Sequence, residues 1–343
     1  MRPGGVFDES YETDIAIVRT RTQWFLLFAA LVCMFLIPVF ADAYWLGWLT
    51  KLFITIIAVL GLHVLTGLCG QFSIGHAAFV GVGAYIAAIL TTKCGLSGWL
   101  CLPLSALATG IVGLLFGLPC FRLKGFYLAI STLAASFIII WCMRYFASVT
   151  GGLQGLDVAT LKIGTIDLTY SRPAYWLAAV ILIVATHCAK NIQRTSTGRA
   201  FVAIRDNELA AEVNGISVFR YKMLAFFICC LFAGVAGWLW ANTQMRVTPE
   251  QFRLNDSIWY FGMLIIGGMG STAGVFFGAA SLRALQMLID QIAPMLHSVQ
   301  LILALNLVVF SGVIVLFLMF APKGIAHVWD KVKAQYRLHP FSD

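Results

Sequence analysis

Long runs of apolar residues separated by short polar segments make up most of this chain. The runs do not alternate between apolar and polar positions, and about 20 apolar residues suffice to cross a bilayer as a helix. The pattern therefore predicts an all-α polytopic membrane protein with about ten transmembrane helices. The predicted spans are 24–40, 46–66, 67–92, 99–119, 126–143, 174–189, 223–241, two short spans within 257–289, and 299–320. They form one membrane domain, 24–320, between an N-terminal segment, 1–23, and a tail, 321–343.

Glycine interrupts two of these apolar stretches. Residues 67–83 hold five glycines in seventeen positions, and 267–278 repeats the order of spaced glycines, a polar pair and small residues. The likeness indicates a duplicated unit, and broken helices at corresponding places in two halves of a transporter mark its translocation path. Irregular backbone at membrane depth is equally compatible with close helix packing and no substrate contact. The candidates for a path are Gln71, Ser73, Gly75, His76, Tyr85, Gly268, Gly270 and Ser271.

His76 follows the first glycine break directly, where the third predicted span begins. An ionisable side chain within a membrane span is a functional candidate by default. The alternative is a histidine that bonds a backbone carbonyl freed by the break, and the sequence leaves both interpretations open. His63 and His187 lie nearer to span ends and are expected to be structural.

One long polar segment, 190–222, stands between two apolar runs. It holds six Lys or Arg residues against three acids, so it is expected on the cytoplasmic side, where basic loops are retained. Apolar and acidic positions between 201 and 212 recur at spacings of three and four, which predicts a helix. Gly215 predicts its end, because glycine tolerates the left-handed conformation after the last turn. The segment is expected to form a helix-turn-helix that a partner can grip, and a simple solvated face is the alternative.

The distribution of basic residues supports this arrangement. With ten crossings, both termini are cytoplasmic, and the cytoplasmic segments hold 15 Lys or Arg residues against six in the outer segments. Lys51 and Arg283 fall within apolar runs, and Lys51 is close enough to the outer end of its span to reach the interface. Residues 41–43 resemble a signal-peptidase site, but the length of the preceding apolar run and its acidic flank favour an uncleaved first span.

The composition excludes several classes of protein. The chain is 60% apolar and 11% charged, whereas soluble domains carry roughly a quarter charged residues. The net charge of +8 reflects basic loops, so no nucleic-acid partner is expected. The nine cysteines are expected to be small buried apolar residues rather than metal ligands, with a Cys94–Cys101 disulfide as the alternative. The chain has no P-loop motif, the loose dinucleotide-like match at 268–273 follows no strand, and no catalytic set stands out, so neither a cofactor nor an enzymatic activity is expected.

Six stretches, in one order along nearly the whole chain, are similar to the permease subunits of high-affinity branched-chain amino-acid ABC importers. They read TGLCGQFSIGHAAF at 66–79, LKGFYLAISTL at 123–133, TGGLQG at 150–155, GRAFVAIRDNELAAEVNGI at 198–216, GGMGS at 267–271 and PKG at 322–324. The resemblance implies a permease subunit of the bacterial inner membrane that moves branched-chain or related amino acids inward. It also implies two cytoplasmic ATPase subunits, a second permease chain and a periplasmic binding protein as partners, with membrane lipid around the spans.

The resemblance further implies that 198–215 is the loop that couples the permease to its ATPases. The corresponding residues are Gly198, Arg199, Arg205, Glu208, Ala210, Ala211, Glu212 and Gly215. Because the chain has Glu-Leu-Ala-Ala where the family has a contiguous Glu-Ala-Ala, Glu208 and Glu212 remain alternatives for the key acid.

Two other functions remain open from the sequence. Related permeases carry urea or amides, and a stand-alone secondary transporter would need no ATPase but would normally show a coupling-ion acid within a span. Almost no acid lies in the spans, and Asp290 sits at the end of one. The spans also offer no obvious partner for an amino acid's carboxylate, so specificity is expected to rest largely with the binding protein.

Overall fold

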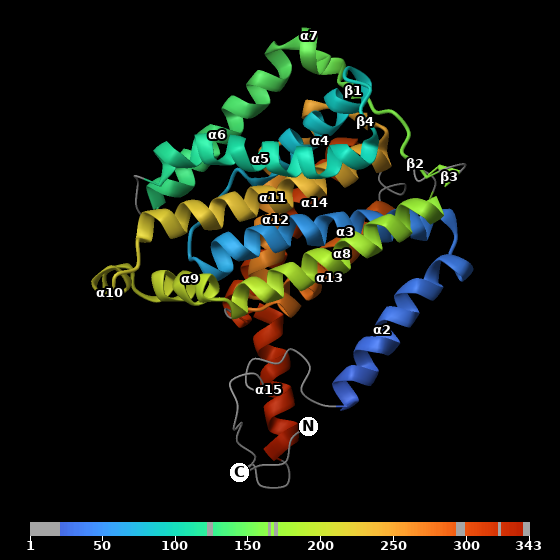
Figure 1. Ribbon diagram of the computed structural model, residues 1–343. Helices are drawn as coiled ribbons and strands as arrows, with labels where there is room; N and C mark the ends of the chain where they lie inside the picture. The colour runs from blue at the N-terminus through green and yellow to red at the C-terminus, as the bar shows by residue number, and fades with distance from the viewer. Residues whose placement is uncertain are drawn as a thin grey trace.

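The computed structural model describes residues 21–121, 126–163, 166–167, 171–292, 299–321 and 324–338, which form a bundle of helices (Figure 1). The long helices are α2 (Arg21–Phe40), α3 (Ala43–Leu62) with its π-helical extension η1 (His63–Leu68), α4 (His76–Thr92), α5 (Gly98–Cys120), α6 (Phe126–Tyr145), α8 (Ser171–Arg194), α11 (Val218–Gln244), α12 (Leu254–Gly267), α13 (Thr272–Ile292) and α14 (Val299–Phe320). The other helices are α7 (Ala147–Thr150), η2 (Gly152–Gln154), α9 (Ser196–Asp206), α10 (Glu208–Val213), η3 (Pro249–Phe252) and α15 (Gly324–Leu338). The predicted all-α class is confirmed.

The apolar helices follow the predicted spans closely. Among the described residues, six segments are long and apolar enough to cross a membrane: 43–68, 98–120, 127–145, 171–194, 218–244 and 272–291. The same part of the chain holds three shorter apolar helices, at Trp24–Phe40, His76–Thr92 and Asn306–Phe317. The number of ten crossings stays a prediction. Most of the N-terminal segment, Arg122 and Lys124 of the predicted inner turn, and the basic residue Lys323 lie outside the described residues.

Helix α11 is the centre of the bundle and packs against α3, α4 and α5. Glycine allows this close approach, because a side-chain carbon at Gly83 of α4 would lie 2.6 Å from the Cα atom of Gly234 in α11. About one turn further along α11, the fully buried Trp238 donates a hydrogen bond from Nε1 to the carbonyl of Gly98 at 2.9 Å. The core of this protein is therefore made where α11 crosses its three neighbours.

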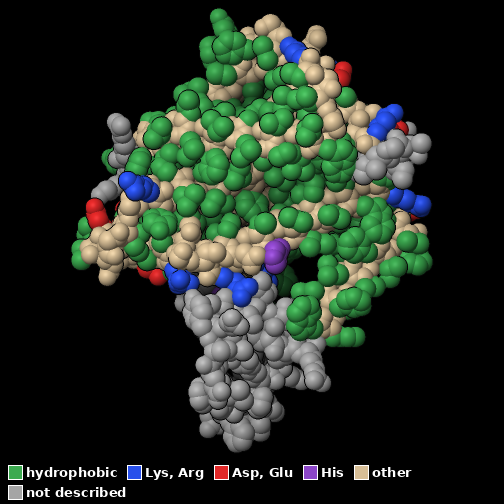
Figure 2. All heavy atoms as spheres, in the orientation of Figure 1, with side chains coloured by type: hydrophobic (Ala, Val, Ile, Leu, Met, Phe, Trp, Pro, Cys, Tyr) green, Lys and Arg blue, Asp and Glu red, His purple; other side chains and the backbone are tan. Residues whose placement is uncertain are grey.

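The bundle has two distinct ends (Figure 1). Helices α9 and α10 lie at one end, which we call the α9–α10 end. At the opposite, β-ribbon end, β1 (Leu156–Asp157) pairs with β4 (Arg246–Val247), and β2 (Lys162–Ile163) pairs with β3 (Ile166–Asp167), both antiparallel. The β1–β4 ribbon joins two loops that the sequence predicts on the same side of the membrane. Figure 2 shows hydrophobic side chains covering the face between these ends, with charged side chains gathered toward the edges.

The prediction that the cysteines are buried apolar residues is confirmed only in part. All nine are free, so the alternative disulfide between Cys94 and Cys101 is not formed. Five are buried, but Cys33, Cys94 and Cys188 are exposed and Cys142 is half-buried. Exposure is compatible with an apolar role for Cys33 and Cys188, because both lie on long helices whose outer faces carry other apolar side chains.

Candidate functional site

Two polar caps shape the helix pair at the α9–α10 end. The side-chain oxygen of Thr195 accepts a hydrogen bond from the amide of Gly198 at 3.3 Å, which caps the start of α9. Asn207 Oδ1 accepts one from the amide of Ala210 at 3.1 Å, which caps the start of α10. The sequence predicts one helix through this region, and that prediction is wrong because the extended backbone of Asn207 divides it. The predicted stop at Gly215 is confirmed by its φ of 81°.

One side of this helix pair is anchored to the bundle. Phe201 and Ile204 of α9 and Ala211 of α10 are buried in the core. Lys222, near the start of α11, donates a hydrogen bond from Nζ to Glu208 Oε1 at 2.5 Å. The lysine side chain is 6% exposed and the glutamate side chain 37%. This contact therefore ties α10, through its first residue Glu208, to α11.

The other side of α10 faces outward. Leu209 is 72% exposed and Val213 is 88% exposed, and their spacing of four residues puts them next to each other on the helix. Ala210, Glu212 and Gly215 are exposed around them. The two acids thus have different surroundings, since Glu208 is paired within the chain whereas Glu212 belongs to the outward face. No sequence signal other than two apolar residues in a polar segment points to Leu209 and Val213.

Helix α9 also contacts the first glycine break. Arg205 donates a hydrogen bond from Nη1 to the carbonyl of Gly67 at 3.1 Å, and its guanidinium pairs with Asp206 at 2.9 Å. A second contact joins the Nε2 atoms of Gln193, at the end of α8, and His63, at the start of η1, at 2.8 Å. Arg199 is exposed and donates from Nη1 to the carbonyl of Arg194 at 3.2 Å, within the α8–α9 region. Arg205 therefore links α9 to the first glycine break, as Glu208 links α10 to α11.

The structure brings the two glycine breaks together. The first comprises the end of η1, with Gly67, and the irregular segment that leads to α4, and the second separates α12 from α13. A side-chain carbon at Gly67 would overlap the carbonyl oxygen of Met269, so only glycine allows this contact. Of the candidates in the second break, Gly268 is buried, Ser271 is half-buried and Gly270 is exposed.

The remaining path candidates lie in the core. His76 is 1% exposed, and its Nε2 bonds the carbonyl of Ala58 at 2.8 Å while its Nδ1 lies 3.4 Å from Cys229 Sγ. This matches the alternative of a histidine bonded to a backbone carbonyl, although that carbonyl belongs to the C-terminal part of α3 and not to the break. Buried positions are also taken by Gln71, Ser73, Gly75 and Tyr85. That these residues line a path stays a prediction.

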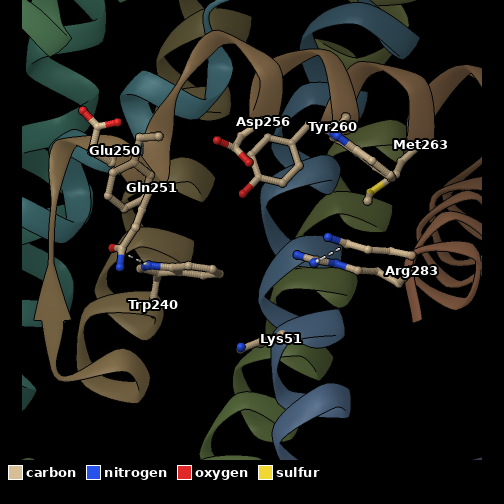
Figure 3. Close-up of a pocket in the computed structure, with 11 residues that line it drawn as sticks. Lys51, Trp240, Glu250, Gln251, Asp256, Tyr260, Met263 and Arg283 are labelled. Atoms are coloured by element: carbon tan, nitrogen blue, oxygen red, sulfur yellow. Dashed lines mark hydrogen bonds between the residues drawn. The ribbon is translucent and has the colours of Figure 1, made fainter. Parts of the chain in front are cut away.

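A cavity of about 310 Å³ lies between η3 and helices α3, α11, α12 and α13 (Figure 3). Two of its lining residues, Lys51 and Arg283, are recognised from the sequence only as basic residues that fall within apolar runs. Both also line a second cavity of about 390 Å³, between the first turns of α3 and the last turns of α13. Sequence reasoning missed this site, although charged residues within membrane spans are the signal that marks one.

The fold and the site together define a multi-pass transport permease. The structure has helices that can span a membrane, two glycine breaks that face each other, and a capped helix pair at one end. Residues 44–319 match the family described as branched-chain amino acid transport system, permease component. The chain belongs to this family. It is a permease component of a branched-chain amino-acid ABC transport system, which works with ATPase and other ABC components, and it is not an enzyme.

Known relatives support the same assignment. The chain is 31% identical over 301 residues to the high-affinity branched-chain amino acid transport system permease protein LivM of Salmonella typhimurium, which covers 80% of this chain and 68% of that protein. The LivM protein of Escherichia coli gives the same identity and coverage. A shorter similarity, 30% identity over 138 residues, joins 38% of the chain to 39% of the autoinducer 2 import system permease protein LsrC of Klebsiella pneumoniae. No solved structure matches the chain.

Proposed function

We propose that this chain is one half of an inner-membrane importer for branched-chain amino acids, and that α9 and α10 couple its spans to cytoplasmic ATPase subunits. The two-sided construction of α10 carries this proposal. Its inner side is tied to α11 by the 2.5 Å contact between Glu208 and Lys222, and its outer side presents the exposed pair Leu209 and Val213. An exposed apolar pair on a firmly held helix is suited to a groove on a partner protein.

The remaining contacts supply a route for movement. ATP binding would close the ATPase dimer and displace α9–α10, and the hydrogen bond from Arg205 to Gly67 would pass that displacement to the first glycine break. Because Gly67 lies against Met269, the second break and the helices on either side of it would move as well. Alternating access follows when these helices tilt, and ATP hydrolysis resets them.

The two ends of the bundle then receive opposite roles. With the basic α9–α10 end in the cytoplasm, the β-ribbon end faces the periplasm, where a binding protein would deliver the substrate. The complete transporter would hold a second permease chain and two ATPase subunits. The branched-chain cargo rests on the family and on the names of the relatives at 31% identity.

The test is affinity purification of the tagged full-length chain from its native membranes in mild detergent, with partners identified by mass spectrometry. The wild-type chain is expected to recover P-loop ATPase subunits and a second multi-span permease. The double variant Leu209→Asp/Val213→Asp should recover roughly tenfold less ATPase, because it places charges in an apolar contact. Leu153→Asp is the matched control, since Leu153 is 68% exposed in η2 at the opposite end.

Three results would count against the proposal. Undiminished ATPase recovery by the double variant would remove α10 from the coupling contact. An equal loss with Leu153→Asp would show that the effect is not specific to the α9–α10 end. Recovery of the chain by itself, together with ion-gradient-driven uptake in ATP-free vesicles, would establish the secondary transporter instead.

A further inference from the structure

Arg283 carries a positive charge into the bundle and forms no ion pair within the part of the chain that the structure describes. Its Nε and Nη2 donate to Thr55 Oγ1 at 3.2 and 2.6 Å, and its Nη1 donates to Gln286 Oε1 at 3.0 Å. Both partners are uncharged, and a guanidinium has five N–H donors, so two donors remain. A charge within a membrane span is costly unless a counter-charge or a functional ligand meets it. The arrangement leaves the cationic side of the 310 Å³ cavity ready for an anion.

The opposite wall of the same cavity is acidic. Asp256 and Tyr260, on neighbouring turns of α12, point into the space that Arg283 and Lys51 enter from α13 and α3 (Figure 3). One carboxylate oxygen of Asp256 accepts a hydrogen bond from the amide of Arg253 at 3.1 Å, which fixes the side chain. In the part of the chain that the structure describes, Asp256 forms no ion pair with Arg283 or Lys51. Opposite charges therefore face each other across open space.

Aromatic side chains close the rest of the cavity. Trp240 of α11 is held by a hydrogen bond from its Nε1 to Gln251 Oε1 at 3.2 Å, and Trp259 of α12 stacks on Phe310 with ring centroids 4.0 Å apart. Met263 adds a flexible apolar side chain on the same helix as Trp259. The lining thus combines charged and amide side chains with aromatic ones. Small-molecule sites likewise place polar groups beside apolar and aromatic side chains, in volumes from roughly 300 Å³ upward.

We propose that this cavity is a binding site for a zwitterionic amino acid within the permease. Arg283, assisted by Lys51, receives the carboxylate, and Asp256 receives the ammonium group. The side chain of the amino acid lies against Trp240, Trp259 and Met263. The charge pattern determines the class of ligand, whereas a branched-chain side chain rests on the proposed function. The site supplies a partner for a substrate carboxylate that was not obvious from the sequence of the spans.

The second cavity adjoins the proposed site and shares lining residues with it. Arg283, Lys51 and Gln286 line both cavities, and the second lies against the first turns of α3 and the last turns of α13. A cation shared by two adjoining cavities can hold a carboxylate in either one and pass it between them. Transport requires binding of this kind, tight enough to admit the substrate and weak enough to let it leave.

The experiment measures binding of radiolabelled L-leucine to the purified complex in lipid nanodiscs, without the binding protein. Competition by 3-methylbutylamine, which lacks the carboxylate, and by 4-methylpentanoate, which lacks the ammonium group, reports each half of the site. The variants are Arg283→Gln, which keeps a polar side chain but removes the charge, and Asp256→Asn, which keeps side-chain size and the ability to cap α12. Arg172→Gln is the matched control, because Arg172 is an exposed arginine of α8 outside the cavity.

The expected results are specific to each half of the ligand. Arg283→Gln should weaken leucine binding roughly 10-fold to 100-fold, as expected for a lost hydrogen bond to a charged group, and leave 3-methylbutylamine unchanged. Asp256→Asn should weaken leucine and leave 4-methylpentanoate unchanged, and Arg172→Gln should change nothing. Because each variant keeps one ligand as an internal control, a folding defect is distinguishable from loss of one contact.

Other outcomes separate this inference from the proposed function. Leucine binding that both variants leave intact, equal losses for all three ligands, or no binding to the wild-type complex would overturn the site, even if ATPase subunits co-purify. If a different zwitterionic amino acid binds with dependence on Arg283 and Asp256 while leucine does not, the site is supported and the proposed cargo is overturned.

Discussion

Two groups of charged residues in this protein are built in opposite ways. At the α9–α10 end, the buried ammonium of Lys222 meets Glu208 at 2.5 Å. In the cavity, Arg283 is hydrogen-bonded to Thr55 and Gln286, with no other partner among the described residues, and Asp256 stands across open space. A paired charge holds one element against another, whereas an unpaired charge beside a cavity is a cost that a ligand can remove. The difference separates a mechanical contact from a binding site.

The same helices join these two regions. Helix α3 carries Lys51 at the cavity and Thr55, which accepts hydrogen bonds from Arg283. It continues into η1, where Gly67 accepts the hydrogen bond from Arg205 of α9. Helix α13 carries Arg283 and begins just after the second glycine break, which touches Gly67 through Met269. The contacts between the coupling helices and the cavity are therefore contiguous, and variants along them test how far each region depends on the other.

The largest effect is expected where the two glycine breaks touch. Gly67→Ala would drive a side-chain carbon into the carbonyl oxygen of Met269 and the ring of His63, and should destabilise the protein by about 3 kcal/mol. Gly270→Ala is the matched control, because nothing lies within 4 Å of the added carbon. Thermal unfolding of the purified variants measures the difference. Equal midpoints for the two variants would mean that the breaks do not pack as described.

A smaller effect should distinguish the two partners of the ion pair. Glu208→Gln leaves the buried Lys222 ammonium without its acid and should cost about 2 kcal/mol, after allowance for the partial exposure of the pair. Lys222→Met leaves a carboxylate that is 37% exposed and can be hydrated, so its cost should be lower. Unfolding midpoints of both variants and their ATPase recovery test this order. The reverse order would show that Lys222 has another role.

Gly215→Val should act on coupling more than on folding. Its φ of 81° places a β-branched residue in strain of about 1–2 kcal/mol, but nothing packs within 4 Å of the position. We expect nearly normal abundance of the complex, with lower leucine uptake for each ATP hydrolysed. Normal transport at normal abundance would exclude a role for this turn.

The smallest expected change in stability is a gain, whereas the preceding variants are expected to lose stability. Arg283→Met removes a charge that only neutral groups meet, so the unfolding midpoint of the empty complex should rise slightly, by about 1 kcal/mol in stability, or stay unchanged. Leucine binding should be lost in the same variant. A clear fall in the midpoint would make Arg283 a structural residue and would weaken the contrast with Lys222.

The helices were predictable from the sequence, because an apolar run long enough to cross a bilayer has few alternatives to a helix. The break at Asn207 was not, since periodic apolar positions on both sides of it concealed a residue whose side chain caps a new helix. The contact between Gly67 and Met269 was also out of reach, because 202 positions separate them in the sequence and only packing brings them together.

The candidate site was predictable only in part. The polar segment 190–222 indicated a coupling element, but the division between the tethered Glu208 and the outward Glu212 depends on where Lys222 lies. The cavity was missed because its charges come from separate helices. Lys51, Asp256 and Arg283 are far apart along the chain, and each has a simpler explanation when it is considered by itself.

The most direct test of the coupling claim places a photo-crosslinking amino acid at Val213 in the intact, tagged complex. The proposal predicts a crosslink to a P-loop ATPase subunit, because Val213 is 88% exposed on the outward side of α10. The same group at Leu153, on the β-ribbon end, should give no such product. A crosslink to the ATPase from position 153, or none from position 213, would contradict the assignment of α9 and α10 as the coupling element.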